Sequence, residues 1–176
     1  GQTRVGVSRD ILKLASETGC KELAVGVETA DPQVLKLIDK KQTMSMVRDF
    51  ITYAYEFGIK VKMCLILGLP GEPKDIVQVT INFIRDTNPD FIAVSGFCPV
   101  PGSIIYQKSK YYGIKSIDKD LRKHAHLMFR FNDDEEHGIP FEYEKENQWG
   151  ETFTRKEIIE NVKEVQQFCK EREMVY

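Results

Sequence analysis

The chain has 176 residues, of which 41% are hydrophobic and 30% are charged, with a formal net charge of −2 at pH 7. This length suffices for one compact domain, and the near-neutral charge makes nucleic acid an unexpected main partner. No apolar run approaches the roughly 18 residues that span a bilayer, and no signal region opens the sequence, so a cytoplasmic protein without membrane contact is expected.

Apolar strands and amphipathic helices alternate from the start of the chain. Ser8 is typical of a helix N-cap, and the helix that follows is predicted to end at Gly19. A short apolar run at residues 23–27 predicts a strand buried on both faces. Asp31 and Pro32 then favour a new helix, because an N-cap residue is followed by proline at the first helical position.

Two further strand–helix units follow at similar spacing. Residues 45–57 have the pattern of an amphipathic helix, and residues 61–67 predict a second buried strand. Residues 75–85 repeat the helical pattern, residues 91–94 predict a third strand, and a helix is expected near 104–112. This alternation predicts an α/β fold with about three parallel strands and flanking helices.

The pattern changes after Gly113. Residues 114–150 are mixed and polar, with an acidic cluster at 133–136, and favour a short hairpin or a covering loop. Thr154 and Glu157 have capping-box spacing, and their helix is predicted to run to about Glu171. The sequence therefore divides into an α/β part, residues 1–113, and a C-terminal hairpin and helix extension, residues 114–176.

Ligand-binding groups are expected where the strands end, because ligands of parallel α/β folds lie at the C-terminal ends of the strands. Glu28 follows the first strand, where its carboxylate either binds a ligand or supports the N-terminus of the next helix. The Gly68–Glu72 turn lets backbone approach a ligand closely, but lacks the ending of a phosphate-binding loop. Pro101 and Gly102 follow the third strand, and the three ends together predict one pocket.

Lys40 and Lys41 are candidates to neutralise a ligand carboxylate, although lysines after a helix are more often solvated partners of its dipole. Three histidines have no acidic or cysteine partner at motif spacing, so metal binding is not expected at His124, His126 or His137.

The four cysteines lie dozens of residues apart, so no two have the spacing of a zinc or iron–sulfur ligand pair. A lone cysteine in an apolar stretch is typically a small core residue, and disulfides are not expected in a cytosolic chain. The cysteines are Cys20, Cys64, Cys98 and Cys169.

The strand-end segments, taken in order and spacing, resemble the radical S-adenosylmethionine (SAM) superfamily. Within the superfamily, the segments most resemble the group that is often paired with a cobalamin-binding domain. This group includes the anaerobic magnesium-protoporphyrin monomethyl ester cyclases. Residues 113–176 do not enter the resemblance. Seven segments carry it, namely Thr3-Arg4-Val5, residues 19–29, residues 34–40 with Thr43, Gly58-Ile59, residues 68–72, Asn88-Pro89-Asp90 and residues 99–103.

The resemblance implies a SAM site at the strand ends. Glu28 would contact the amino group or the ribose of SAM, and Lys40 its carboxylate. The Gly68–Gly71 turn would pass near the adenine or ribose, and the Pro101-Gly102 loop would border the adenine or the substrate. The implied cofactor-binding residues are Glu28, Lys40, Gly68, Pro70, Gly71, Pro101 and Gly102.

Two departures from the family pattern matter. Cys64 stands where the related coproporphyrinogen dehydrogenases place an acid, so a ribose contact from that position is not implied. The superfamily's Cys-x-x-x-Cys-x-x-Cys motif is absent. In the family its thiolates hold a [4Fe–4S] cluster, and electron transfer from that cluster cleaves SAM to a 5′-deoxyadenosyl radical.

We therefore expect a partial, half βα barrel from a radical SAM oxidoreductase, which contributes SAM and substrate contacts but is inactive alone. The expected partners are the missing N-terminal half of the barrel and a small-molecule substrate, with cobalamin a possible cofactor. The first strand would expose its edge, and self-association through that surface is expected.

Two other interpretations stay open. One is a non-catalytic scaffold that binds a nucleotide or a partner through its strand-end loops. The other is a small open-sheet α/β binding domain whose turns resemble the family by convergence.

Overall fold

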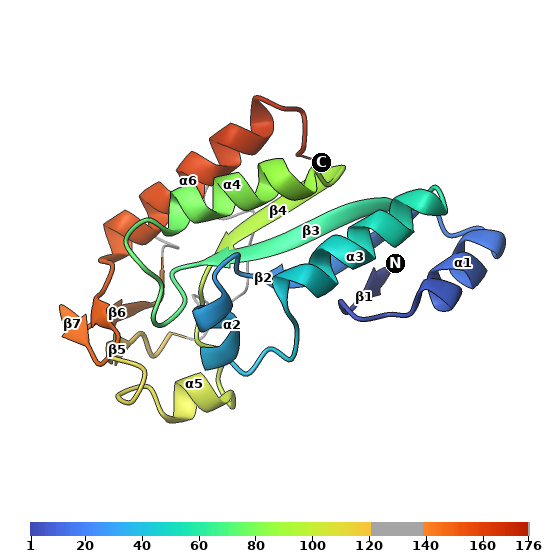
Figure 1. Ribbon diagram of the computed structural model, residues 1–176. Coiled ribbons are helices and arrows are strands. Elements are labelled where there is room, and N and C mark those ends of the chain that lie inside the picture. The colour runs from blue at the N-terminus through green and yellow to red at the C-terminus, as the bar shows by residue number, and fades with distance from the viewer. Residues whose placement is uncertain (121–138, 176) are drawn as a thin grey trace.

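The computed structural model describes residues 1–120 and 139–175, and its centre is a four-stranded parallel sheet in the order β1-β2-β3-β4 (Figure 1). The three predicted strands are confirmed as β2, β3 and β4. The expected number is corrected, because β1 adds a fourth strand that pairs with Ala24 and Val25 of β2. Thus β1, rather than β2, forms that edge of the sheet. The strands are β1 (Gln2–Thr3), β2 (Glu22–Glu28), β3 (Lys60–Leu67) and β4 (Phe91–Gly96).

Three helices begin after the capping residues that the sequence predicts, namely Ser8, Asp31 and Thr154. Ser8 Oγ accepts the Ile11 N–H, and Asp31 accepts the N–H groups of two residues in the next turn. Thr154 and Glu157 exchange side-chain and backbone hydrogen bonds in a capping box. The helices are α1 (Arg9–Glu17), α2 (Pro32–Leu37), α3 (Met44–Glu56), α4 (Ile76–Thr87), α5 (Ile104–Gln107) and α6 (Arg155–Lys170).

One helix is much shorter than its sequence pattern predicts. We expected a helix near residues 104–112, but α5 ends at Gln107. The chain then turns, with the Gly113 N–H donating to Lys110 O and the Ile114 N–H donating to Ser109 O. Gly113 has a φ of 72°, a left-handed conformation that ends helical geometry at low cost for glycine.

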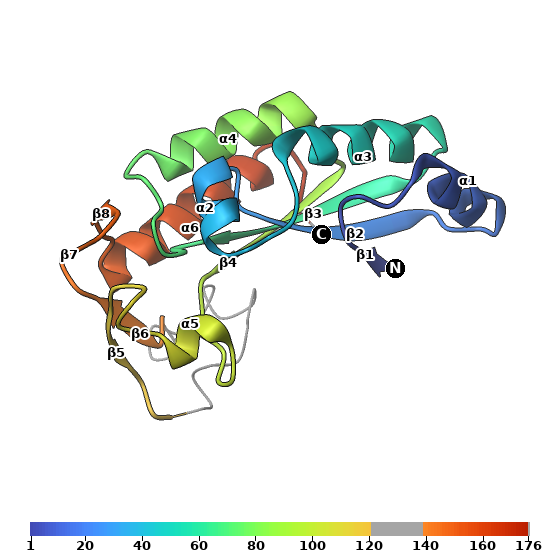
Figure 2. The same cartoon turned by 60° about the horizontal axis from the view of Figure 1, so that its bottom comes forward.

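The sheet has one closed face and one more open face. On β3, Val61, Met63, Leu65 and Leu67 are all at most 2% exposed and belong to the core beneath α3 and α4. The intervening residues, including Cys64, point to the opposite, inner face and are partly exposed. Figure 2 shows α3 and α4 on one side of the sheet and α5 with β5 and β6 on the other, near the strand ends.

Two expectations are corrected by this arrangement. Residues 23–27 were predicted to form a strand buried on both faces, whereas β2 buries Val25 and Val27 and leaves its other residues only partly buried. Strand β3 likewise buries one face and leaves the other partly exposed. Cys64 was predicted to be a core residue, but it lies on the inner face because it alternates with the buried residues of β3. Cys20 and Cys98 are also only partly buried, whereas Cys169 is fully buried in the core.

The extension forms small hairpins, as predicted, and its helix joins the main core. Strand β5 (Ile114–Ile117) pairs antiparallel with β6 (Phe141–Tyr143), and β7 (Glu146–Asn147) pairs with β8 (Gly150–Glu151). Gln166 of α6 donates to Val94 O of β4, and Ile92 of β4 donates to Met174 O. The acidic cluster and the three histidines named above lie outside the described residues. Within the described ranges, no helix is long and apolar enough to cross a membrane.

Candidate functional site

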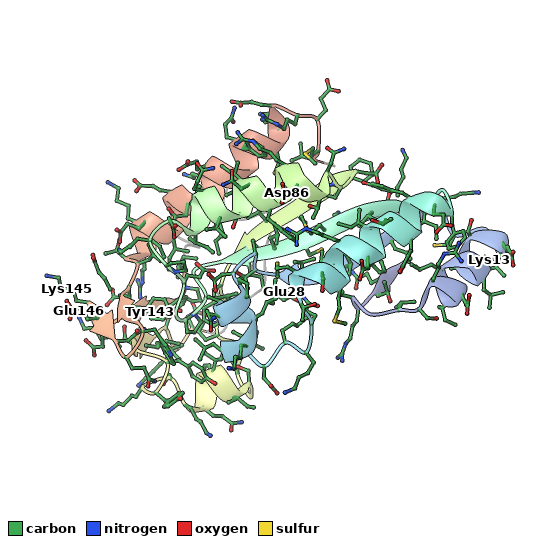
Figure 3. All side chains as sticks on the ribbon, in the orientation of Figure 1. Lys13, Glu28, Asp86, Tyr143, Lys145 and Glu146 are labelled. Carbon is green, nitrogen blue, oxygen red and sulfur yellow. The ribbon has the colours of Figure 1, made fainter. Side chains whose placement is uncertain are left out.

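The end of β2 folds the Glu28 side chain back over the sheet. Pairing with β3 shifts between Gly26 and Glu28, and Glu28 has a φ of 71°, which is uncommon for a residue other than glycine. Its Oε1 lies 2.5 Å from the Lys40 Nζ, and the two side chains are 22% and 27% exposed. Figure 3 places Glu28 beside α2 and the start of α3. The structure therefore brings together the two charged residues that the sequence singled out.

Gly26 provides the space for this ion pair. A Cβ built on Gly26 would lie 2.5 Å from Glu28 Oε1 and 3.3 Å from Lys40 Nζ. The carboxylate and the ammonium therefore lie directly over a glycine in the sheet. The sequence interpretation did not single out Gly26. The available signal was a glycine inside an apolar strand, which often marks a close approach.

The loop that carries Lys40 is fastened to the end of β2. Lys40 N donates to Leu35 O, and the buried Gln42 side chain donates to Val27 O at 2.7 Å. Asp31, not Glu28, caps α2, and Lys36 is the basic residue in the last turn of that helix. The alternative roles of Glu28 as a helix cap and of Lys40 as a dipole partner are therefore not the ones adopted.

The turn after β3 is closed around the Gly68 peptide groups. Gly68 has a φ of 87°; its N–H donates to Glu72 Oε2 at 2.7 Å, and its carbonyl accepts from the Tyr143 hydroxyl at 2.9 Å. Glu72 is 5% exposed, and this burial raises its pKa to about 8. The carboxyl group is therefore largely protonated at neutral pH.

Neighbouring elements pack tightly against this turn. A Cβ on Gly68 would lie 2.7 Å from Ile158 Cγ2 of α6, and one on Gly71 would lie 2.8 Å from Leu37 Cδ2 of α2. Pro70 is buried, and Gly71 is partly exposed beside Trp149. The segments that follow β2 and β3 are thus in contact with each other.

Pro101 and Gly102 lie on the exposed segment that leads into α5. Gly102 has a φ of 89°, and a Cβ built there would meet no atom within 4 Å. Ser103 caps α5 by accepting the Tyr106 N–H. Of the predicted residues, these two are the ones left exposed rather than packed against a neighbouring strand end.

Cys64 lies in the same part of the inner face as the ion pair. Across the sheet, Gly26 is paired with Cys64, and Cys64 with Ala93. Burial raises the pKa of the Cys64 thiol, the positive charge of Lys62 lowers it in part, and the negative charge of Glu28 makes a smaller raising contribution. The thiol is thus close enough to Glu28 for its reactivity to respond to ligand binding at the end of β2.

A cavity of about 620 Å³ lies between α2 and the start of α3, which is within the usual size range for small-molecule sites. Lys40 is the predicted residue that lines it, together with Lys36, Lys41 and Thr43. Lys40 therefore stands between this cavity and Glu28.

The described residues do not offer a metal-ligand cluster. No group of three His, Cys, Asp or Glu side chains among them is placed to hold a metal ion. The cysteines lie on separate elements, from the loop before β2 to α6. This donor set does not fit a [4Fe–4S] cluster, which needs three thiolates in one place when SAM completes the coordination.

Comparison with known proteins gives a consistent family. Residues 2–84 match the model of the radical SAM superfamily. An uncharacterized methyltransferase of Pyrococcus horikoshii is 29% identical over 97 residues, which cover 55% of this chain and 21% of that protein. The oxygen-independent coproporphyrinogen III oxidase of Helicobacter pylori is 30% identical over 95 residues, covering 53% and 21%. This chain thus spans about one fifth of the length of these relatives.

The anaerobic magnesium-protoporphyrin IX monomethyl ester cyclase of Rubrivivax gelatinosus is also similar, with 26% identity over 98 residues, covering 56% of this chain and 18% of the cyclase. A solved radical SAM methyltransferase from Kitasatospora setae, with cobalamin and a [4Fe–4S] cluster bound, superposes with a TM-score of 0.56 at 16% identity. That match covers 64% of this chain and 23% of the methyltransferase, and it supports the likeness of fold.

Proposed function

Residues 2–84 of this chain belong to the radical SAM superfamily, and we propose on this basis that the chain supplies the SAM- and substrate-binding strand ends of a radical SAM enzyme. The observation that carries the proposal is the ion pair between Glu28 and Lys40 over Gly26. It places an anion and a cation side by side on the inner face of the sheet, at the end of a parallel strand where ligands of such folds bind.

The charges of this pair complement the amino-acid part of SAM. SAM carries an ammonium and a carboxylate on one carbon atom, so Glu28 would bind the ammonium or the ribose hydroxyls, and Lys40 the carboxylate. The two side chains neutralise each other, and both remain partly exposed to solvent. Gly26 leaves room above the sheet for the exchange of partners.

The Gly68–Gly71 turn would lie near the adenosine. It belongs to the neighbouring strand, and Gly71 contacts Leu37 of α2, which comes from the same strand-end loop as Lys40. Pro101 and Gly102, on an exposed segment, would border the adenine or the substrate. The roles of Gly68 and Pro70 are confined to backbone positioning, since both residues are buried.

The [4Fe–4S] cluster of the superfamily is assigned to polypeptide outside these 176 residues, since the cysteines here do not fit it. In the complete enzyme that cluster supplies the electron that cleaves SAM. The chain alone is expected to be inactive and to bind no cluster. Anaerobic reconstitution with iron and sulfide, followed by iron analysis and absorption spectroscopy, would contradict this if the chain acquired a stable [4Fe–4S] chromophore.

The substrate is proposed to be a small molecule that lies against the exposed strand-end segments. The related enzymes named above include an oxidase, a cyclase and methyltransferases, and one methyltransferase structure holds cobalamin. Cobalamin is therefore a possible further cofactor of the complete enzyme.

The test of the proposal is binding of S-adenosylhomocysteine, a redox-inert analogue, to the whole chain. Occupation of the site should slow alkylation of Cys64 by iodoacetamide, because Cys64 lies beside Gly26 in the sheet register. Mass spectrometry of the Cys64 peptide measures the rate, and the Cys20 peptide serves as the internal reference.

Two neighbouring lysines provide a matched pair of variants. Lys40 pairs with Glu28 over Gly26, whereas Lys41 pairs with Asp39 on the exposed loop. Lys40→Met should abolish the protection of Cys64, and Lys41→Met should leave it intact. Equal protection in both variants would overturn the proposed site. Protection by adenosine as strong as that by S-adenosylhomocysteine would instead favour a nucleotide-binding scaffold.

A further inference from the structure

The C-terminal extension contacts the turn after β3 through a side-chain hydrogen bond as well as through packing. Tyr143 lies on β6, and its hydroxyl donates to the carbonyl of Gly68 at 2.9 Å. Figure 3 shows Tyr143 at the end of the molecule that carries β6 and β7. Along the chain, Tyr143 lies 75 residues from Gly68. The bond therefore joins two segments that chain connectivity leaves free to separate.

Both the N–H and the carbonyl of Gly68 are hydrogen-bonded to side chains. The Gly68 N–H donates to the buried Glu72 carboxyl group. Glu72 belongs to the turn itself, so its bond only closes the turn on itself. The bond from Tyr143 comes from β6, outside the turn, and adds a directional contact to the packing of Ile158 against Gly68.

Aromatic packing holds the Tyr143 ring in place. It lies edge-on to Phe141 with centroids 4.9 Å apart, and Phe141 lies edge-on to Phe97 at 5.3 Å. Phe97 directly follows β4, and its N–H donates to Leu67 O at the end of β3. Through Phe141 and Phe97, the Tyr143 ring is thereby held in place relative to the ends of both β3 and β4. Edge-to-face rings at these separations are a favourable and directional contact.

We propose that Tyr143 is a positioning residue for ligand binding, because its hydroxyl fixes the Gly68 peptide and so couples the C-terminal extension to the turn. This inference rests on the proposed function for the nature of the ligand, SAM. Its structural part, the coupling of the extension to the turn, stands on the contacts alone.

The test uses the full chain and a carbonyl-specific signal. The dipeptide Gly-Leu occurs once in the sequence, at residues 68–69. Labelling glycine carbonyls with carbon-13 and leucine amides with nitrogen-15 therefore isolates one NMR signal from the Gly68 carbonyl and the Leu69 amide. Tyr143→Phe removes the hydroxyl and keeps the ring. It should shift the carbonyl resonance and speed exchange of the Leu69 amide about fivefold, the equivalent of one ordinary hydrogen bond.

Tyr55→Phe is the matched control. The Tyr55 hydroxyl also donates to a backbone carbonyl, that of Asn88, at 2.7 Å, but at the opposite end of the sheet. This variant should lose comparable stability and leave the Gly68–Leu69 signal unchanged. An unshifted carbonyl resonance in Tyr143→Phe would overturn the inference, as would equal shifts in both variants.

Titration with S-adenosylhomocysteine then separates the two proposals. Tyr143→Phe should raise the dissociation constant about fivefold relative to both the wild type and Tyr55→Phe. Equal affinities in all three proteins would overturn the positioning role. If the wild-type signal does not respond to the ligand, the assignment of SAM fails, while the carbonyl shift of Tyr143→Phe still decides whether the extension holds the turn.

Discussion

The ends of β2 and β3 are neighbours in the sheet, yet they are built in opposite ways. At the end of β2, a carboxylate and an ammonium meet in a partly exposed pair over a glycine. At the end of β3, a carboxyl group is buried, and α2 and the C-terminal extension, including its helix α6, enclose the turn. The first arrangement leaves its charged groups in contact with solvent, whereas the second covers its carboxyl group.

The contrast indicates different roles for the two strand ends, with charged groups at the end of β2 and a rigid backbone turn at the end of β3. Charged groups that must bind and release a ligand need access to water, since deep burial of an unpaired charge is costly. A turn that contacts a ligand only through its backbone binds better when it is held in one conformation.

The largest expected effect is on the pH dependence of stability, through Glu72. The unfolded carboxyl titrates near 4.5 and the folded one near a pKa of about 8. Between these values the unfolded chain has released a proton that the folded chain keeps, so wild-type stability falls as the pH rises from 4.5 to 8. Glu72→Gln removes this titration. Between pH 4.5 and pH 8 its free energy of unfolding should therefore rise relative to that of the wild type by up to roughly 5 kcal/mol.

Urea unfolding at pH 5 and pH 8 measures this difference. Glu157→Gln is the control of opposite sign, because hydrogen bonding to the Thr154 N–H lowers the pKa of Glu157. The wild type should lose the contribution of Glu157 at acid pH, not on the way to pH 8. A Glu72→Gln variant whose stability tracks the wild type at both pH values would mean that Glu72 is not buried as described.

The next effect concerns the rigidity of the β3 turn. Gly68→Ala places a side chain at a φ of 87° and 2.7 Å from Ile158 Cγ2, so backbone strain and overpacking add. We expect a loss of about 3 kcal/mol in the free energy of unfolding. Gly102→Ala has nearly the same φ but open space around it, and should lose only about 1 kcal/mol. Equal losses would show that the enclosure of the turn contributes nothing.

At the end of β2, a similar substitution should affect binding rather than folding. The nearest atoms to a Cβ at Gly26 would be the side-chain ends of Glu28 and Lys40, which shift more readily than backbone. Gly26→Ala should therefore change stability by less than about 1 kcal/mol and weaken S-adenosylhomocysteine binding about tenfold. Calorimetry and urea unfolding on the same sample compare the two. Unchanged affinity would remove Gly26 from the site.

The smallest effect is expected from self-association through the open side of the molecule. The inner face and the short edge strand β1 are less covered than the face beneath α3 and α4. Light scattering after size exclusion should give a mass above 20.3 kDa that rises with concentration. Association over the inner face should also slow alkylation of Cys64. A monomer at high concentration would contradict this prediction.

Local chemistry explains why much of the fold was predictable. Ser8, Asp31 and Thr154 cap the helices that follow them because a cap depends on residues only three positions apart. The helix expected near residues 104–112 is the exception, since α5 already ends at Gln107, well before Gly113. The two-residue strand β1 has no periodicity of its own and depends entirely on pairing with β2.

The parallel α/β order, the resemblance to the radical SAM superfamily, and Glu28 and Lys40 as charged candidates at a strand end all follow from the residues alone. These properties depend on spacing along one strand or helix. Only the tertiary structure decided that Glu28 and Lys40 meet over Gly26, that Glu72 is buried, and that Tyr143 bonds to Gly68. Such contacts join residues 12 to 75 positions apart, and their energies depend on the surrounding burial, which no local pattern specifies.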